Sequence, residues 1–247
     1  MAEFNILEAA GLPQKKKRER GITITKSLKK SSEELGFDFY DGERKYGYGG
    51  YLYDGRWQAV AKVAQERYKL NQKSRVLIDR CHKGFLVYDL KNLIPGITVY
   101  GIHPKEYAIN HCMEGFGRWA LINGVEKNSD HKMIEERAKQ KILPFLIAGN
   151  SKDLPFKDKF FDSVISIENA CSYFENDCRN VVKEIVRITK DRGEKSYIQN
   201  DSWTNENEKN KLRKWSFLCK TFLSTKEWEK LYLEEGYNGD WGYTIIE

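Results

Sequence analysis

Short β-rich runs alternate with segments of helical period over most of this chain, and this alternation restricts its fold more than any other feature. Arg75–Asp79 is an apolar run of the length of one buried strand, and Phe85–Leu93 follows with helical spacing before the stop signal Pro95-Gly96. Further strands are predicted over residues 97–102, 145–148, 161–168, 195–201 and 241–246. Strands that alternate with helices indicate a parallel sheet.

Apolar residues spaced by three and four predict the helices between these strands. The predicted helices cover residues 57–70, 85–93, 105–112, 176–189 and 205–219. Ser224 and Glu227 have the spacing of a capping box before a last helix, which Gly236 should end. Residues 114–140 fit the alternation poorly, so we interpret them as an insertion with a loop and a helix over Met133–Ile142.

The length of 247 residues suits one α/β domain, and we divide the chain into three parts. Residues 1–36 are predicted to be a basic, flexible segment, because residues 1–32 hold eight Lys or Arg and three Glu, a net charge of 8 − 3 = +5. Residues 37–70 are predicted to form a cap or lid and a helix. Residues 71–247 are predicted to form the main domain, which includes the insertion 114–140.

Several classes of protein are disfavoured by composition. The longest apolar runs are far shorter than the roughly 18 residues of a membrane span, so we expect a cytoplasmic protein without a membrane partner. The five cysteines lack CxxC spacing and are expected to be reduced thiols.

The basic run Lys15–Arg20 is interpreted as a solvated tail. With a nearly neutral body and no base-reading motif, a nucleic-acid partner is not expected, although Trp203 and Trp215 could stack on bases.

The segment Phe37–Trp57 is rich in glycine and tyrosine. Glycines permit tight turns, and tyrosines offer stacking faces with polar tips, so this segment could cover a pocket. Tyr46, Tyr48 and Tyr51 are the candidate substrate or lid residues. The alternative is that these tyrosines anchor an irregular N-terminal segment to the body, and the two interpretations are compatible.

A series of short motifs lies in a specific order along the chain. The motifs are Val76-Leu77, Lys83-Gly84-Phe85, Val99–Ile102, Gly149-Asn150, Leu154–Phe156 and Phe161–Ser166. Because these motifs occur in this order, the chain resembles class I S-adenosylmethionine-dependent methyltransferases over roughly residues 45–247. The resemblance implies a Rossmann-like α/β fold with a mostly parallel seven-stranded sheet flanked by helices. The front segment, Tyr46–Tyr51 with Asp54–Trp57, is similar to small-molecule methyltransferases, including ones tied to surface-carbohydrate pathways.

The family's cofactor motif after the first strand, acidic-x-Gly-x-Gly-x-Gly, is largely overwritten. Its four positions fall on Ile78, Arg80, His82 and Gly84, so only the last is kept. An isoleucine cannot bond the methionine amine, and two side chains occupy volume that glycines leave empty. The acid that should bind the ribose after the second strand is replaced by His103.

The resemblance implies a degenerate cofactor site. Its candidate residues are Asp79, Arg80, Cys81, His82, Gly84, His103, Asn150, Ser151 and Glu168. Asp79 follows the expected acidic position by one residue and should face the other way, because neighbouring side chains alternate along a strand. Asn150 and Ser151 stand where the family places adenine-facing residues. No catalytic residue is assigned; the candidates are Glu168, His82 and His103.

Two other chemistries are disfavoured by the sequence. Asp79, Cys81, His82 and His103 include zinc-ligand types near strand ends, but the alternation of side chains opposes their convergence, so no metal is predicted. A nucleophilic Cys81 or Cys171 lacks any accompanying signature.

Two functional hypotheses follow from the resemblance. The first is a non-catalytic subunit, a pseudoenzyme without cofactor, that stabilises or activates a related active methyltransferase in a heteromer, or forms a homodimer. The second is an active enzyme that uses S-adenosylmethionine in a rearranged site and methylates a hydroxyl or amine of a small molecule.

Overall fold

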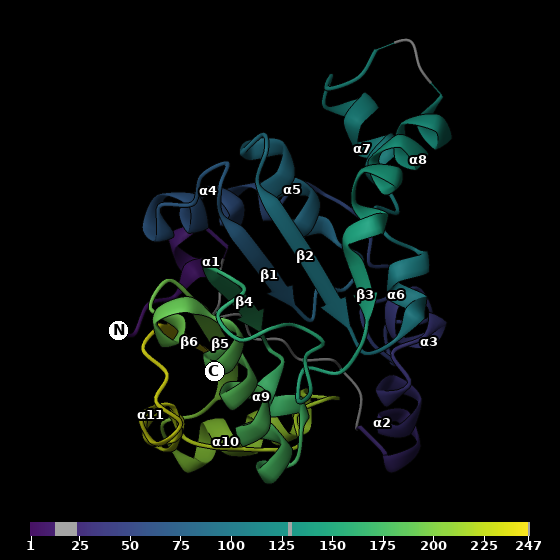
Figure 1. Cartoon of the computed structure of the whole chain (residues 1–247). Coiled ribbons are helices and arrows are strands. Elements are labelled where there is room, and N and C mark those ends of the chain that lie inside the picture. Colours follow the sequence, from purple (N-terminus) through teal and green to yellow (C-terminus); the bar gives the residue numbers. More distant parts are fainter. Residues whose placement is uncertain (13–23, 128–129, 247) are drawn as a thin grey trace.

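A central sheet of six strands organises the computed structural model, which describes residues 1–12, 24–127 and 130–246. The strand order is β3-β2-β1-β4-β5-β6, and every neighbouring pair is parallel (Figure 1). The strands are β1 Arg75–Asp79, β2 Thr98–His103, β3 Leu146–Ala148, β4 Ser163–Ile167, β5 Tyr197–Ser202 and β6 Asp240–Ile245. The α/β prediction is confirmed, but the described residues contain six strands rather than seven, because the chain after β5 forms two helices and returns as one strand.

Helices cover both faces of the sheet. They are α1 Ile6–Ala9, α2 Lys26–Glu33, α3 Phe37–Tyr40, α4 Trp57–Tyr68, α5 Phe85–Leu93, α6 Glu106–Asn110, α7 Phe116–Ile122, α8 His131–Ile142, α9 Glu175–Ile188, α10 Glu206–Trp215 and α11 Thr225–Glu234. Short 3-10 turns are η1 Leu143–Phe145, η2 Ala170–Ser172 and η3 Lys190–Gly193. None of the helices in the described ranges is long and apolar enough to cross a membrane.

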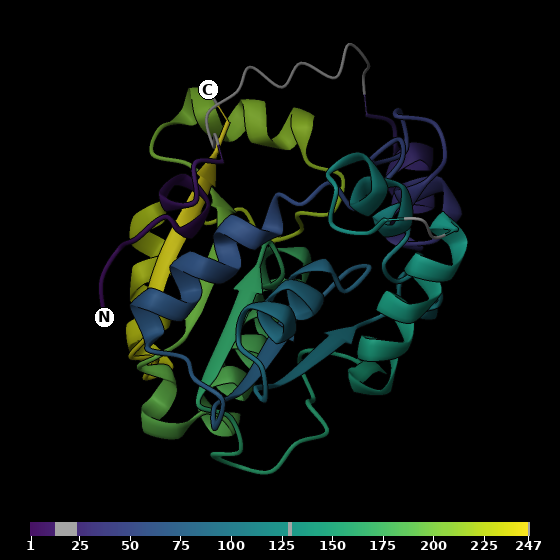
Figure 2. The same cartoon turned by 90° about the horizontal axis from the view of Figure 1, so that it is seen from above.

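The alternation of side chains along β1 supplies two separate cores. Val76 and Ile78 pack with α1, α4 and α5 on one face, whereas Leu77 packs with α9 and α11 on the other. Figure 2 looks onto the face that α4 and α5 cover. Each fully buried aliphatic side chain stabilises the fold by roughly 1.5–3 kcal/mol. The two cores therefore hold the sheet from both faces, and each also includes a residue from a loop at the carboxyl edge, Cys81 in the first and Cys171 in the second.

The N-terminal part packs against this body at two places. Residues 1–12, which the sequence assigned to a flexible segment, include the fully buried Ile6, and the amide of Phe4 donates to the Trp241 carbonyl at 2.7 Å. Helices α2 and α3 lie near α6 at the carboxyl edge of the sheet (Figure 1), where Leu35, Phe39, Tyr40 and Ala108 form a small core. The basic run Lys15–Arg20 lies outside the described residues.

The insertion 114–140 contains two helices, α7 and α8, beyond the β3 edge (Figure 1). The predicted loop before Met133 is wrong in part, because α7 occupies 116–122. Gly117 lies inside α7, and a Cβ there would meet the carbonyl oxygen of His131 at 1.8 Å. This glycine therefore permits the close approach of α7 to α8 and does not break the helix.

The strand order reverses between β1 and β4, since β2 and β3 follow on one side and β5 and β6 on the other. In open parallel sheets the crevice at such a switch point, outside the carboxyl ends of the strands, is where ligands bind. The loops that follow β1 and β4 are thus the place to look for a site.

Candidate functional site

The loop after β1 has left-handed backbone at all three glycine positions of the motif, although only Gly84 is a glycine. Arg80, His82 and Gly84 have φ angles of 61°, 51° and 76°, all in the left-handed region. These are the positions where the family pattern has glycine. A residue with a Cβ costs roughly 1–2 kcal/mol in this conformation, so the surrounding structure must hold Arg80 and His82 in place.

The Arg80 side chain crosses from the end of β1 to the end of β4. Its Nη1 donates to the Glu168 carbonyl oxygen at 2.6 Å and to the Ser172 hydroxyl at 2.5 Å. The residue is only 6% exposed. Arg80 therefore fills the space that a glycine at this position would leave open, and it ties the two loops of the switch point together.

His82, Tyr40 and His103 form a hydrogen-bonded chain. The buried Tyr40 hydroxyl lies 2.8 Å from His82 Nδ1 and 2.8 Å from His103 Nε2, so it donates to one ring and accepts from the other. Burial lowers the pKa of His103 to about 4 and the pKa of His82 well below its usual value, with the Arg80 charge adding to both shifts. Both imidazoles are therefore neutral at pH 7, and the group in the ribose position is engaged by Tyr40.

Lys83 forms an ion cluster beneath the same loop. Its side chain is fully buried, and Nζ donates to both Asp41 carboxylate oxygens at 2.7 and 2.8 Å and to Glu114. The Tyr107 hydroxyl donates to Asp41 at 2.8 Å. This cluster joins the loop to the residues after α3 and before α7, and the sequence analysis did not find it.

Asp79 faces away from Ile78, as strand alternation predicted. Its carboxylate accepts hydrogen bonds from the hydroxyls of Ser151 and Ser166 at 2.5 and 2.8 Å and from the Asn169 amide at 2.6 Å. Burial raises the pKa of Asp79, and the three hydrogen bonds oppose that shift. Asp79 and Ser151 thus take part in a buried polar network with each other.

The remaining predicted residues have diverse surroundings. Cys81 is buried, and burial raises the pKa of its thiol; Asn150 is exposed and its side chain accepts from the Lys152 amide at 3.2 Å. Gly84 begins α5, and a Cβ there would lie 2.6 Å from Ile142. Tyr48 and Tyr51 line two cavities at this edge of the sheet, whereas Tyr46 lines neither.

The predicted zinc-ligand types do not form a metal site. Asp79, Cys81, His82 and His103 do not gather into one group of candidate ligand atoms. Within the described part of the chain, the one such group is Cys171, Asp201 and Cys219, whose ligand atoms all lie within 4.8 Å. The spacing of these three residues in the sequence did not predict a metal site.

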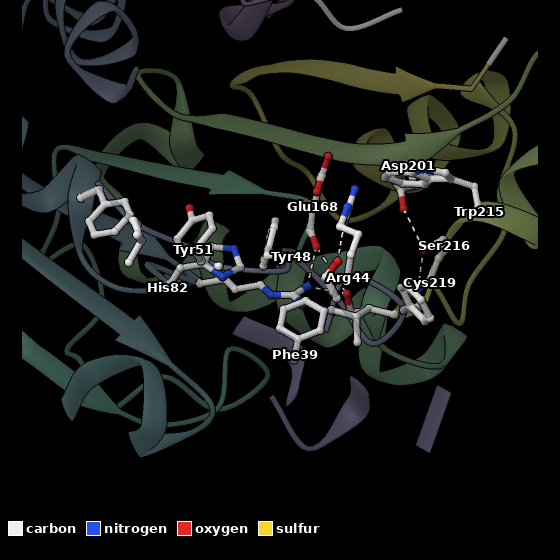
Figure 3. Close-up of a pocket in the computed structure, with 18 of the residues that line it drawn as sticks. Phe39, Arg44, Tyr48, Tyr51, His82, Glu168, Asp201, Trp215, Ser216 and Cys219 are labelled. Carbon is white, nitrogen blue, oxygen red and sulfur yellow. Dashed lines mark hydrogen bonds between the residues drawn. The ribbon is translucent and has the colours of Figure 1, made fainter. Parts of the chain in front are cut away.

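Two cavities of about 320 and 480 Å³ meet at this edge of the sheet. They share a set of polar and aromatic residues. The shared residues are Tyr48, Tyr51, Asp54, Arg56, Trp57, Arg80, His82, Phe85 and Glu168. Figure 3 shows the smaller cavity, with Tyr51 and His82 at one end, Glu168 and Arg44 in the middle, and Trp215 at the other end. The larger cavity extends along the carboxyl ends of β1 and β4, where it is lined by Ile78, Ile165 and Ile167.

These residues do not fit S-adenosylmethionine in the position that the glycine motif provides. Arg80 and His82 fill the loop and are hydrogen-bonded there, and Ile78 offers no acceptor for an amine. His103 is held by Tyr40.

Comparison with known proteins agrees with the fold. Residues 81–195 match the family model described as a methyltransferase domain. This part of the chain is therefore similar to methyltransferase domains. No curated protein matches its sequence.

The solved structures that match this chain are distant in sequence. A chain of the complex between the Haloferax volcanii Trm112 methyltransferase activator and a methyltransferase is 17% identical, with 87% of this chain and 77% of that chain covered and a TM-score of 0.48. A Bacillus halodurans methyltransferase is 16% identical, with coverages of 71% and 68% and a TM-score of 0.49. Geranyl diphosphate C-methyltransferase from Streptomyces coelicolor is 12% identical, with coverages of 72% and 59% and a TM-score of 0.48.

Proposed function

We propose that this chain is a non-catalytic member of the methyltransferase family, a subunit that stabilises or activates a related active methyltransferase. The observation that carries the proposal is the pair Arg80 and His82, whose hydrogen-bonded side chains stand at the glycine positions of the cofactor loop. A side chain that is buried and paired there opposes cofactor entry, because its partners would have to be separated first.

The preserved parts of the chain support the same proposal. Both hydrophobic cores are complete, whereas the substitutions gather at three cofactor-contacting positions, Ile78, Arg80 and His82, and at His103. A fold that is kept after its ligand contacts are lost still offers a surface to a partner. We expect the partner to be a paralogue with an intact glycine motif, or a second copy of this chain, in the cytoplasm.

Calorimetric titration of S-adenosylmethionine and S-adenosylhomocysteine tests the proposal. The chain alone should show no binding at micromolar cofactor concentrations, and its addition to a co-encoded paralogue should raise the activity or the melting temperature of that paralogue. The double variant Arg80→Gly, His82→Gly serves as a positive control for a reopened loop. Micromolar binding by the unmodified chain would contradict the proposal.

The alternative is an active methyltransferase for a hydroxyl or amine of a small molecule. The cavity of about 320 Å³, lined by Glu168, His82, Tyr48 and Tyr51, favours it. The chain's own contribution would be to orient the substrate, with Glu168 or a neutral histidine as the base. Activity of the chain alone that is lost in Glu168→Gln would support this alternative.

A further inference from the structure

Arg80 presents one edge of its guanidinium without a partner. Its Nη1 is used by Glu168 and Ser172, but neither Nε nor Nη2 donates a hydrogen bond to any residue in the ranges that the structure describes. Nε is buried, and the residue lines both cavities. Nε and Nη2 form the side of an arginine that binds the two oxygens of a carboxylate or phosphate. A buried, unpaired donor of this kind indicates a missing acceptor.

The bonded half of the guanidinium positions the unpaired half. The left-handed backbone at Arg80 and the two acceptors at Nη1 fix the side chain before any ligand arrives. Pre-organisation of this kind reduces the entropy that binding must overcome. The arrangement therefore suits recognition of a planar or tetrahedral oxyanion better than a mobile surface arginine would.

The residues around Arg80 indicate the chemical character of the rest of the ligand. The larger cavity is lined by Leu7, Ile78, Ile165 and Ile167. At Ile78 the family pattern has an acid, so its replacement removes a negative charge that would repel an anion. Three acidic side chains line the larger cavity, and each already accepts a hydrogen bond. Asp54 accepts from Arg56 at 2.7 Å, Asp79 from Ser151 at 2.5 Å, and Glu168 from Thr244 at 3.3 Å.

We propose that this protein binds a small oxyanion with an apolar body. The carboxylate or phosphate group binds to the Nε and Nη2 edge of Arg80, and the apolar body occupies the cavity of about 480 Å³ beside Ile78, Ile165 and Ile167. The site thus binds an anion where the family pattern binds an amine-bearing cofactor. This inference is independent of the subunit role, since ligand binding and cofactor binding are measured separately.

Titration calorimetry on the full chain tests the site with three ligands: octanoate and octyl phosphate below their micelle concentrations, and octanol below its solubility limit. The second readout is the change in tryptophan fluorescence that is lost in Trp57→Phe, because Trp57 lines both cavities. At least one of the two anions should bind saturably and about tenfold to a hundredfold more tightly than octanol, which has the same body without the charge. The stronger anion identifies the head group. Acetate and inorganic phosphate, which lack the body, should bind more weakly than their octyl counterparts.

Arg80→Gly should reduce anion affinity by a similar factor, and Arg80→Lys, which keeps the charge but lacks the paired edge, should reduce it by an intermediate factor. Arg192→Gly is the matched control, because Arg192 is also a left-handed arginine, with φ of 57°, but lies in η3 and lines neither cavity. Equal affinity for octanol and the anions, no saturable binding of either anion, or unchanged binding in both Arg80 variants would overturn the proposal.

Discussion

The loop after β1 and the turn η3 both put residues with side chains into the left-handed region, but they use that conformation differently. In the first, Arg80 and His82 are drawn into the interior by hydrogen bonds to Glu168, Ser172 and Tyr40. In the second, Asp191 and Arg192, with φ of 50° and 57°, are exposed at the surface. Left-handed backbone alone does not mark a site; buried hydrogen-bonding partners around it do.

The largest expected difference between the loop after β1 and the turn η3 is the stability lost when the lysine of each is replaced. Lys83 is fully buried between Asp41 and Glu114, whereas Lys190 in η3 is half-exposed and pairs with Asp162 at 2.6 Å. Lys83→Met should lower the free energy of unfolding by about 3–5 kcal/mol, because it removes a fully buried ammonium and leaves two partly buried carboxylates without their cation. Lys190→Met should cost about 1 kcal/mol or less. Urea denaturation measures both; equal losses would break the comparison.

The second-largest expected effect is a pH dependence of the free energy of unfolding, which the buried side chain of His103 produces. The pKa of His103 is lowered to about 4 in the folded chain, from an ordinary value near 6.5 in the unfolded chain. Between these values the unfolded state binds more protons, so this residue's contribution to stability is present above about pH 6.5 and is lost as the pH falls to about 4. The loss should be roughly 3 kcal/mol. His82, whose pKa is also lowered, acts in the same direction.

A variant isolates the histidine contribution from that of buried carboxyl groups. Burial raises the pKa of Asp89 to about 7 and also that of Asp79, and both give the opposite slope in this range. The measured quantity is therefore the difference in unfolding free energy between the unmodified chain and His103→Gln from pH 7 to pH 4. If the difference in unfolding free energy stays constant from pH 7 to pH 4, His103 has the same pKa in the folded and unfolded states, and the prediction is wrong. His131→Gln, at a half-exposed position, is the control.

The smallest expected effect concerns backbone strain itself. Arg192→Gly should stabilise the chain by about 1 kcal/mol, because glycine adopts the left-handed conformation without a Cβ clash. Arg80→Gly should gain less or lose stability, since the same relief is offset by the loss of two partly buried hydrogen bonds. Thermal unfolding of the two variants checks this order, and a larger gain for Arg80→Gly would reverse our interpretation of the two loops.

Much of the sheet and its helices could be predicted from local pattern. The predicted bounds of β1 and α5 agree with the structure, and the capping box of Ser224 and Glu227 is present at the start of α11. Strand and helix periods are properties of contiguous residues, so they are visible in the sequence. The short helices α1, α2 and α3 were not predicted, because four to eight residues carry little periodic signal.

The sequence by itself determined the alternating α/β order and the loss of the glycine motif, because both are written in residues a few places apart. Only the tertiary structure decided what replaced the motif. Tyr40, Asp41 and Glu114 reach His82 and Lys83 from 31 to 42 residues away in the chain. Such contacts depend on how α3, α7 and the β1 loop meet at the carboxyl edge of the sheet, and no local pattern of residues encodes that meeting.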